Sequence, residues 1–165
     1  MGHQRIIGHR GARDLWPENS REGFLKVQAL PIHGVEFDVH PTADGKLAVI
    51  HDPTLERTTE GSGAVAARTA AELAATRLRG SDEGVPMLED VLAILNPSGL
   101  ELHVELKAGA DGTPYPGLEA QVAAAMTQAG LAARTVLTSF WLPVLAELRR
   151  AAPGMRLLAS LDPSS

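Results

Sequence analysis

Three short strings of charged residues and one isolated pair stand at the ends of apolar segments, and they contain the residue types that acid–base and cation chemistry needs. The strings are His9-Arg10-Gly11, Glu36-Phe37-Asp38 and Glu105-Leu106-Lys107, and the pair is His51-Asp52. A β/α barrel delivers the residues of its site to one rim of the sheet in this way, at the ends of its strands.

The spacing inside two of these strings places their charges on one face of a strand. Side chains two positions apart project to the same side, so Glu36 shares a face with Asp38, and Glu105 shares one with Lys107. The alternating positions are apolar and suit packing beneath helices: Val35, Phe37 and Val39 in one segment, and Leu102, Val104 and Leu106 in the other. If the two strands are neighbours, three carboxylates and a lysine meet.

Three nearby carboxylates repel one another and resist ionising together unless a cation neutralises them. A hard divalent ion with oxygen ligands is the simplest remedy, and both Mg2+ and Ca2+ fit. The sequence therefore predicts a cation site, with the choice of metal left open.

Composition limits the class of protein. A chain of 165 residues with 44% hydrophobic and 21% charged residues predicts one soluble domain with a real core. The formal net charge of -5 argues against a nucleic-acid partner. The absence of cysteine excludes disulfides and thiolate metal sites. No apolar run approaches the ~18 residues of a membrane span, so we expect no stable membrane insertion and a cytoplasmic location.

The elements that must position the charged strings alternate along the chain, which predicts a parallel α/β sheet. Expected strands cover residues 5–8, 34–39, 100–106, 135–138 and 157–160, and expected helices lie around 24–30, 88–95, 118–126 and 142–151. Residues 47–50 predict a hairpin return that carries His51 back toward Asp38. Residues 53–86 form an insertion with one short helix, where Thr69 and Glu72 fit a capping box.

The order and spacing of the motifs resemble those of the glycerophosphodiester phosphodiesterases, a (β/α)8-barrel family of the phospholipase C-like kind. The matching strings are His9-Arg10-Gly11, Pro17-Glu18-Asn19, Gly34 to Val39, Asp44-Gly45, His51-Asp52, Leu55 to Thr59, Pro86 to Leu92, Glu105-Leu106-Lys107 and Ser139-Phe140. They cover almost the whole chain. Each string is weak evidence for the family by itself, but their order and spacing together are specific.

The resemblance implies hydrolysis of glycerophosphodiesters, the deacylated remnants of phospholipids, to glycerol 3-phosphate and an alcohol with a divalent cation. By position, Glu36, Asp38 and Glu105 match the family's metal ligands, His9 and His51 its acid/base pair, and Arg10 and Lys107 its phosphate-binding cations. Either histidine can serve as the acid, because an imidazole with a pKa of about 6.5 donates or accepts at neutral pH.

Four further residues are candidates for the pocket, each with a structural alternative. Glu18 and Asn19 lie beside the site in the family, but they also suit the start of a helix. Ser139 either contacts substrate or caps the following helix. Phe140 either walls the pocket or belongs to the core.

The length of the chain departs from the family pattern. A (β/α)8 barrel typically takes ~250 residues, and we predict one incomplete barrel domain over residues 1–165, with about five of eight β/α units and the insertion at 53–86. Five strands leave two bare edges and an uncovered apolar interior. Truncation, a partner segment or a homo-oligomer that completes the barrel would each explain this.

Two other functions stay open at this point. One is an inactive or partner-dependent barrel fragment. The other is a related phospholipase D-like phosphodiesterase that acts on lysophospholipids, against which the absence of cysteine weighs.

Overall fold

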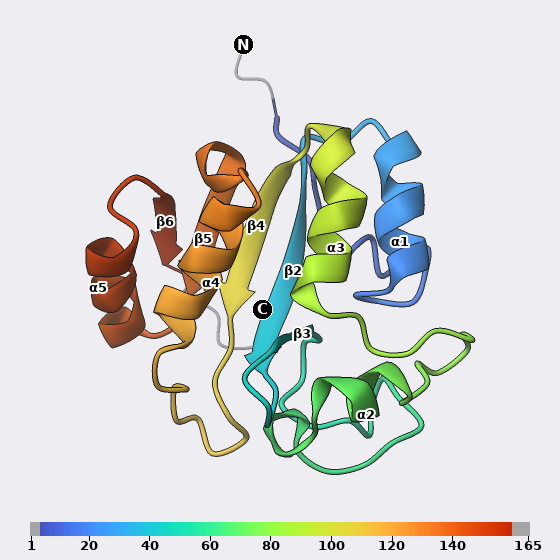
Figure 1. The fold of residues 1–165 in the computed structure, drawn as a ribbon. Coiled ribbons are helices and arrows are strands. Elements are labelled where there is room, and N and C mark those ends of the chain that lie inside the picture. Colours follow the sequence, from blue (N-terminus) through green and yellow to red (C-terminus); the bar gives the residue numbers. More distant parts are fainter. Residues whose placement is uncertain (1–3, 160–165) are drawn as a thin grey trace.

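The computed structural model describes residues 4–159, which form one curved sheet with helices packed against it (Figure 1). The strands follow the order β1-β2-β4-β5-β6, with β3 paired to β2 off this path. Strand bounds are Ile7–Gly8 for β1, Gly34–Pro41 for β2, Leu47–Val49 for β3, Glu101–Leu106 for β4, Thr135–Ser139 for β5 and Arg156–Ala159 for β6. Only β3 runs antiparallel to its neighbour, so the predicted parallel sheet and hairpin return are confirmed.

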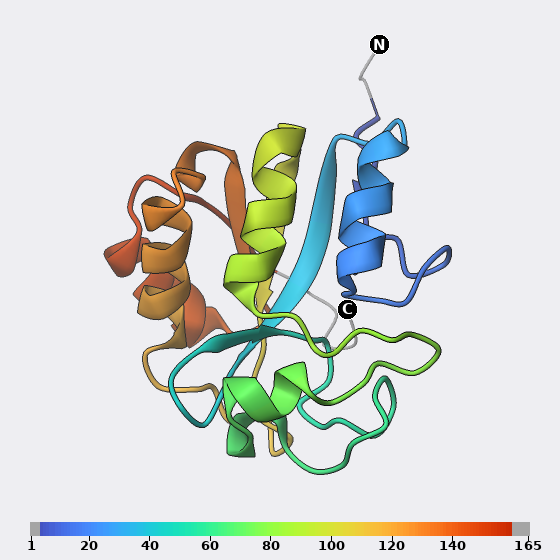
Figure 2. The same ribbon diagram turned by 45° about the vertical axis from the view of Figure 1, so that its right-hand side comes forward.

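Helices α1, α3 and α4 lie side by side over one face of the sheet, and α5 continues the row past β5 (Figures 1 and 2). Helix bounds are Arg21–Lys26 for α1, Ala70–Ala74 for α2, Leu88–Leu95 for α3, Leu118–Gln128 for α4 and Leu142–Ala151 for α5. Short 3-10 turns cover Val27–Ala29, Val65–Ala67, Asn96–Ser98 and Ala132–Arg134. Helix α1 starts at Ser20, whose Oγ accepts a hydrogen bond from the Gly23 N–H at 3.0 Å.

The two faces of the central strands differ as the alternation predicts. Phe37 of β2 and Val104 of β4 are fully buried beneath the helices. The Phe37 ring meets Phe24 of α1 edge to face, with 5.7 Å between centroids. Pairing of β2 with β4 sets Asp38 directly beside Glu105 on the opposite face. The hydrophobic face therefore anchors the strands, and the polar face carries the site.

The expectation of an uncovered apolar interior is wrong for β4. Its inward positions carry Glu101, His103 and Glu105, and Glu101 accepts hydrogen bonds from Arg5, His103 and Arg156. Arg5 precedes one edge strand and Arg156 lies in the other, so ion pairs span this face from both edges. Charged side chains that hydrogen-bond one another therefore occupy a face of the sheet for which the prediction was an apolar one.

The insertion has its own small core and lies beyond the carboxyl ends of the strands (Figures 1 and 2). Its buried cluster consists of Ala48, Ile50, Leu55, Val65, Leu73, Leu78, Val85 and Met87. The predicted capping box of Thr69 and Glu72 opens α2. Glu83 accepts hydrogen bonds from the backbone N–H groups of Arg21 and Glu22 at 2.8 and 3.0 Å, which ties the insertion to the start of α1.

The remaining differences from the predicted elements concern their ends. Strand β1 covers only Ile7–Gly8, because its pairing with β2 begins at Ile7 opposite Gly34, and the Ile6 N–H donates to the His33 side chain instead. The predicted helix around 24–30 divides into α1 and a 3-10 turn. The last strand begins at Arg156, and Ser160 lies outside the described residues. None of the helices in residues 4–159 is long and apolar enough to cross a lipid bilayer.

Candidate active site at the carboxyl ends of the strands

Three carboxylates from two neighbouring strands converge at the end of the sheet. Glu36, Asp38 and Glu105 each offer an oxygen, and these oxygens lie within 4.8 Å of one another. Asp38 is fully buried and Glu105 nearly so. The β2–β4 register brings these residues together, as the alternation predicted. Their assignment as metal ligands remains a prediction.

Two of the three carboxyl groups in the cluster resist ionisation when no cation is bound. Burial, reinforced by the charge of Asp38, raises the pKa of Glu36 far above its ordinary value. Burial also raises the pKa of Glu105. Burial is also the largest effect on Asp38, but the charges of Lys107 and His51 and the hydrogen bonds with Glu36 and Asn19 together outweigh it, so the pKa of Asp38 is lowered. The Lys107 Nζ lies 3.1 Å from Glu105 Oε1 and 3.7 Å from Asp38 Oδ1, so one lysine serves two carboxylates.

The unsatisfied atoms at this point fit a divalent cation. Glu36 Oε1, Asp38 Oδ1 and Asn19 Oδ1 are buried, and each lacks a hydrogen-bond partner among the described residues. Buried polar atoms without partners are costly, and a hard ion with oxygen ligands satisfies several at once. These oxygen donors therefore suit Mg2+ or Ca2+.

The raised pKa values predict how the metal-free protein responds to pH. Above about pH 5, Glu36 and Glu105 are ionised in the unfolded chain but resist ionisation in the fold, so the folded chain binds more protons. In EDTA between about pH 5 and 8, these two carboxyl groups should therefore make the fold less stable as pH rises, most clearly above about pH 6.5, because below it the lowered pKa values of His9 and His40 act in the opposite direction. Excess Mg2+ or Ca2+ should remove most of this loss, because the ion favours the ionised cluster. Thermal unfolding across this range tests the prediction, and identical pH dependence with and without the ion would contradict it.

The loop between β1 and α1 wraps around the carboxylates in a strained conformation. Arg10, Gly11 and Ala12 have φ values of 50, 65 and 63°, which costs non-glycine residues about 1–3 kcal/mol each. A Cβ at Gly11 would lie 3.1 Å from the Phe24 ring, so glycine is needed there for space as well as for its φ. In this conformation the Arg10 N–H donates to Glu36 Oε2 at 3.1 Å.

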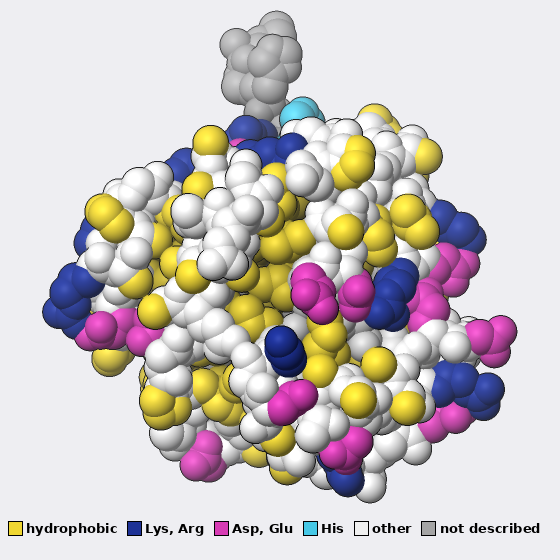
Figure 3. All heavy atoms as spheres, in the orientation of Figure 1, with side chains coloured by type: hydrophobic (Ala, Val, Ile, Leu, Met, Phe, Trp, Pro, Cys, Tyr) yellow, Lys and Arg dark blue, Asp and Glu magenta, His cyan; other side chains and the backbone are white. Residues whose placement is uncertain are grey.

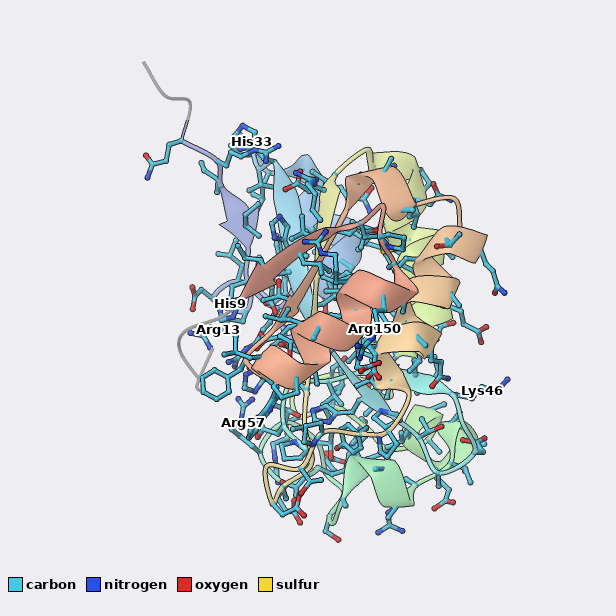
Figure 4. The ribbon with its side chains drawn as sticks, turned by 90° about the vertical axis from the view of Figure 1, so that its left-hand side faces the viewer. His9, Arg13, His33, Lys46, Arg57 and Arg150 are labelled. Atoms are coloured by element: carbon cyan, nitrogen blue, oxygen red, sulfur yellow. The ribbon has the colours of Figure 1, made fainter. Side chains whose placement is uncertain are left out.

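His9 and Asn19 border the carboxylates from the same loop. His9 Nε2 lies 3.4 Å from Glu36 Oε2, and burial followed by the charges of Arg10 and Arg13 lowers the pKa of His9. Figure 4 shows His9 and Arg13 at the same side of the molecule, next to the strand ends. Asn19 Nδ2 donates to Asp38 Oδ2 at 3.2 Å. Asn19 therefore belongs to the carboxylate cluster, although it also stands beside the start of α1.

His51 approaches the site from the strand that returns along β2. The Ile50 N–H donates to the Asp38 carbonyl at 3.0 Å, which brings His51 to the end of β2 as predicted. Its Nδ1 lies 2.8 Å from Asp52 Oδ1. Hydrogen bonding from Arg57 is the main cause that lowers the pKa of Asp52 to about 2, so this partner is a carboxylate anion. An ionised carboxylate on Nδ1 fixes the orientation of the ring.

The His40 side chain forms a hydrogen bond with the backbone of His51. Its Nε2 lies 2.9 Å from the His51 carbonyl, which only accepts, so Nε2 carries the hydrogen. Its Nδ1 then accepts from the Tyr115 hydroxyl at 2.9 Å. Burial lowers the pKa of His40 to about 4, which agrees with a neutral ring in this role.

A cavity of about 290 Å³ opens beside this cluster. Its lining includes His51, Glu105 and Lys107, together with Phe140 and Trp141, which meet edge to face at 5.7 Å. Phe140 is thus at the cavity wall rather than in the core. Ser139 is fully buried, and its Oγ accepts a hydrogen bond from the Trp141 N–H at 3.1 Å, so it holds the turn that precedes α5 but does not cap the helix, whose N-cap is Trp141.

A larger groove of about 650 Å³ lies on the other face of the molecule, between α3 and α4. Figure 3 shows hydrophobic side chains along its floor. Leu88, Leu92 and Ala125 are among the residues that line it, and Lys46 and Glu89 are its only charged ones. It lacks the convergent polar groups of a reactive site, so the smaller cavity is the candidate.

Three contacts around His51 have no counterpart in the sequence prediction. Asp52 and His40 contact this histidine and Arg57 reaches it through Asp52; the sequence assigns none of them a role, although His40 shares a strand face with Glu36 and Asp38 and could line the site. Asp52 follows His51 directly and Arg57 lies in a matched string, which could have indicated them. Their contacts depend on the path of the insertion and of the loop that carries Tyr115, which local patterns do not specify.

The fold and this site together define a TIM-type β/α-barrel protein with a cluster of acidic residues at the carboxyl rim, present here as part of a barrel. Residues 9–161 match the Glycerophosphoryl diester phosphodiesterase family. The chain belongs to this family.

Individual relatives agree with that assignment. The chain is 31% identical over 158 residues to a glycerophosphodiester phosphodiesterase of Caldanaerobacter subterraneus subsp. tengcongensis, covering 92% of this chain and 64% of that protein. It superposes on a provisionally named glycerophosphoryl diester phosphodiesterase of Agrobacterium tumefaciens with 37% identity and a TM-score of 0.88, covering 91% of this chain and 61% of the other.

A third relative was solved with a bound product. An Oleispira antarctica phosphodiesterase in complex with sn-glycerol-3-phosphate has 26% identity and a TM-score of 0.79, with 94% of this chain and 65% of that one covered. The chain thus spans less than two thirds of the length of each of these three proteins.

Proposed function

We propose that this chain hydrolyses glycerophosphodiesters to glycerol 3-phosphate and an alcohol, and that it needs Mg2+ or Ca2+ to do so. The observation that carries the proposal is the meeting of three carboxylates, a lysine and two histidines at one rim of the sheet. Family membership supports the same reaction class, and the product bound to the Oleispira antarctica relative supports the glycerol phosphate half of the substrate.

In this proposal Glu36, Asp38 and Glu105 hold the divalent ion. When bound, the ion supplies positive charge to the phosphate oxygens, which become more negative during displacement. Arg10 adds a fork of N–H donors and Lys107 a compact charge on the same phosphate. Because these charges match the transition state better than the substrate, they accelerate the reaction rather than only bind its reactant.

His9 and His51 divide the two proton transfers. One removes the proton from the attacking oxygen, for which we take the substrate's own glycerol hydroxyl, and the other protonates the departing alkoxide. Water then opens the resulting cyclic phosphate, with the two histidines exchanging roles, to give glycerol 3-phosphate. The Asp52 carboxylate on His51 Nδ1 leaves Nε2 as the ring atom for proton transfer. The assignment of acid and base stays open, since both rings can serve either step.

Two other functions remain beside this proposal. A phospholipase D-like enzyme for lysophospholipids would use the same charged groups, and a partner-dependent fragment would hold the ion without turnover. A panel of glycerophosphocholine, lysophosphatidylcholine and a phosphomonoester distinguishes them. Release of glycerol 3-phosphate from the first substrate alone supports the proposal, turnover of only the second supports the lipid enzyme, and a folded, metal-binding but inactive chain supports the fragment.

We further propose that the open edges of the sheet pair with additional strands, with a second copy of this chain as one source. Within residues 4–159, β1 and β6 each pair on one side only, and unpaired edges invite association. Light scattering of the purified chain should therefore show an oligomer or poorly soluble material, and a compact monomer would contradict the idea. A cytoplasmic role in lipid and glycerol metabolism remains part of the proposal.

A further inference from the structure

The insertion supplies a charged side chain, Arg57, to the surroundings of the candidate site. Its guanidinium forms paired hydrogen bonds with two carboxylates. Toward Asp52, Nε lies 2.8 Å from Oδ2 and Nη2 lies 2.8 Å from Oδ1. Toward Glu18, Nη1 lies 3.1 Å from Oε2 and Nη2 lies 2.7 Å from Oε1. Paired contacts of this kind fix orientation as well as charge.

Both partners of Arg57 touch residues of the proposed machinery. Asp52 Oδ1 lies 2.8 Å from His51 Nδ1, and Glu18 Oε2 lies 3.4 Å from Arg10 Nη1. The chain of contacts thus runs from Arg10 through Glu18, Arg57 and Asp52 to His51. It begins in the β1–α1 loop and ends after β3. Figure 4 shows Arg57 on the same side of the molecule as His9, facing the strand ends.

Arg57 is not itself placed to bind substrate. All three of its guanidinium nitrogens are engaged by the two carboxylates. Without it, Asp52 and Glu18 would each lose a partner, and Asp52 would be free to leave the imidazole. Arg57 therefore acts on the reaction through other residues.

We propose that Arg57 is a positioning residue, which locks Asp52 against His51 and thereby makes the insertion a working part of the active site rather than only a cover. The proposal rests on the phosphodiesterase function proposed above. It assigns a task to residues 53–86 that their small buried core does not explain.

The matched control is Arg77, in the same insertion. It forms a paired contact with Glu60, at 3.1 and 3.0 Å, and is exposed to a similar extent, 53% against 48% for Arg57. The Arg77 pair belongs to a separate surface cluster, in which Arg77 Nη1 also lies 3.9 Å from Asp82 Oδ1. Loss of either arginine should affect the stability of the insertion similarly, so only an effect specific to Arg57 bears on the site.

The kinetic test compares Arg57→Ala, Arg57→Lys and Arg77→Ala in glycerophosphocholine hydrolysis. Arg57→Ala should lower kcat by about 10–100-fold, the usual effect of removing a partner that orients a functional histidine, with a much smaller change in KM. Arg57→Lys should recover part of the loss, and Arg77→Ala should match the wild type. In an Asp52→Asn background, Arg57→Ala should have little further effect, because the two act as a unit. Full additivity would overturn the proposal.

A second readout does not depend on turnover, so that failure of the proposed function and failure of this inference remain distinguishable. Nitrogen-15 NMR of the histidine rings reports which nitrogen of His51 carries hydrogen. Arg57→Ala should shift the His51 ring signals, and Arg77→Ala should leave them unchanged. A wild-type chain without turnover would contradict the proposed function alone, whereas His51 signals unaffected by Arg57→Ala would overturn the role of Arg57.

Discussion

Replacement of His51 by alanine should lower kcat by about 10²–10⁴-fold, the contribution of one general acid or base. The ring lies at the cavity beside Glu105 and Lys107, and its Nδ1 is bound to Asp52. Removing it deletes one of the two proton transfers but leaves the carboxylate cluster and the core untouched. The folded state and the binding of the ion should therefore change little.

The control for this variant is His33→Ala. Figure 4 shows His33 at the far end of the molecule from His9, where its Nδ1 accepts a hydrogen bond from the Ile6 N–H at 2.9 Å. We expect wild-type kcat for this variant, measured under the same conditions. Near-normal turnover by His51→Ala would remove His51 from the mechanism.

Removal of divalent ions should abolish hydrolysis, and added Mg2+ or Ca2+ should restore it. The reason is the carboxylate cluster, in which burial raises the pKa of Glu36 and oxygens of Glu36 and Asp38 lack partners. Without the ion, the phosphate would face this acidic group with only nearby cationic side chains to offset it. Rates in excess EDTA, and after titration with each ion, test this directly.

A pair of variants distinguishes the loss of the bound ion from other effects of the chelator. Asp38→Asn removes a charge from the cluster and should weaken ion binding by calorimetry, together with hydrolysis. Glu89→Gln removes an exposed carboxylate that lines the groove between α3 and α4 rather than the cavity of the site, and should change neither. Full turnover in excess EDTA, or an Asp38→Asn protein with unchanged ion affinity, would contradict the metal role.

Much of the carboxylate cluster was predictable because strand geometry is local. Glu36 and Asp38 are two positions apart, so they share a face wherever the strand lies. Their apolar neighbours Val35 and Phe37 determine which face is buried. Parallel strands then align their carboxyl ends, which brought Glu105 to the same rim. Alternation and topology together are therefore enough to predict where the cluster lies.

The surroundings of His51 were not predictable by the same reasoning. Arg57 contacts Glu18, which lies 39 residues earlier in the chain, and Tyr115 contacts His40 across 75 positions. Such contacts depend on how loops return, and loop paths follow from packing rather than from a repeating pattern. The same limit explains why the polar interior around Glu101 was not predicted. Its partners, Arg5 and Arg156, come from opposite edges of the sheet.

Glycerol 3-phosphate release from glycerophosphocholine by the purified 165-residue chain is the most direct test of the central claim. It should be measured with Mg2+ or Ca2+, with EDTA, and with His51→Ala as the blank. We predict release that requires the ion and disappears in the variant. A folded sample that releases no product with either ion, or that releases it equally in EDTA, would contradict the account.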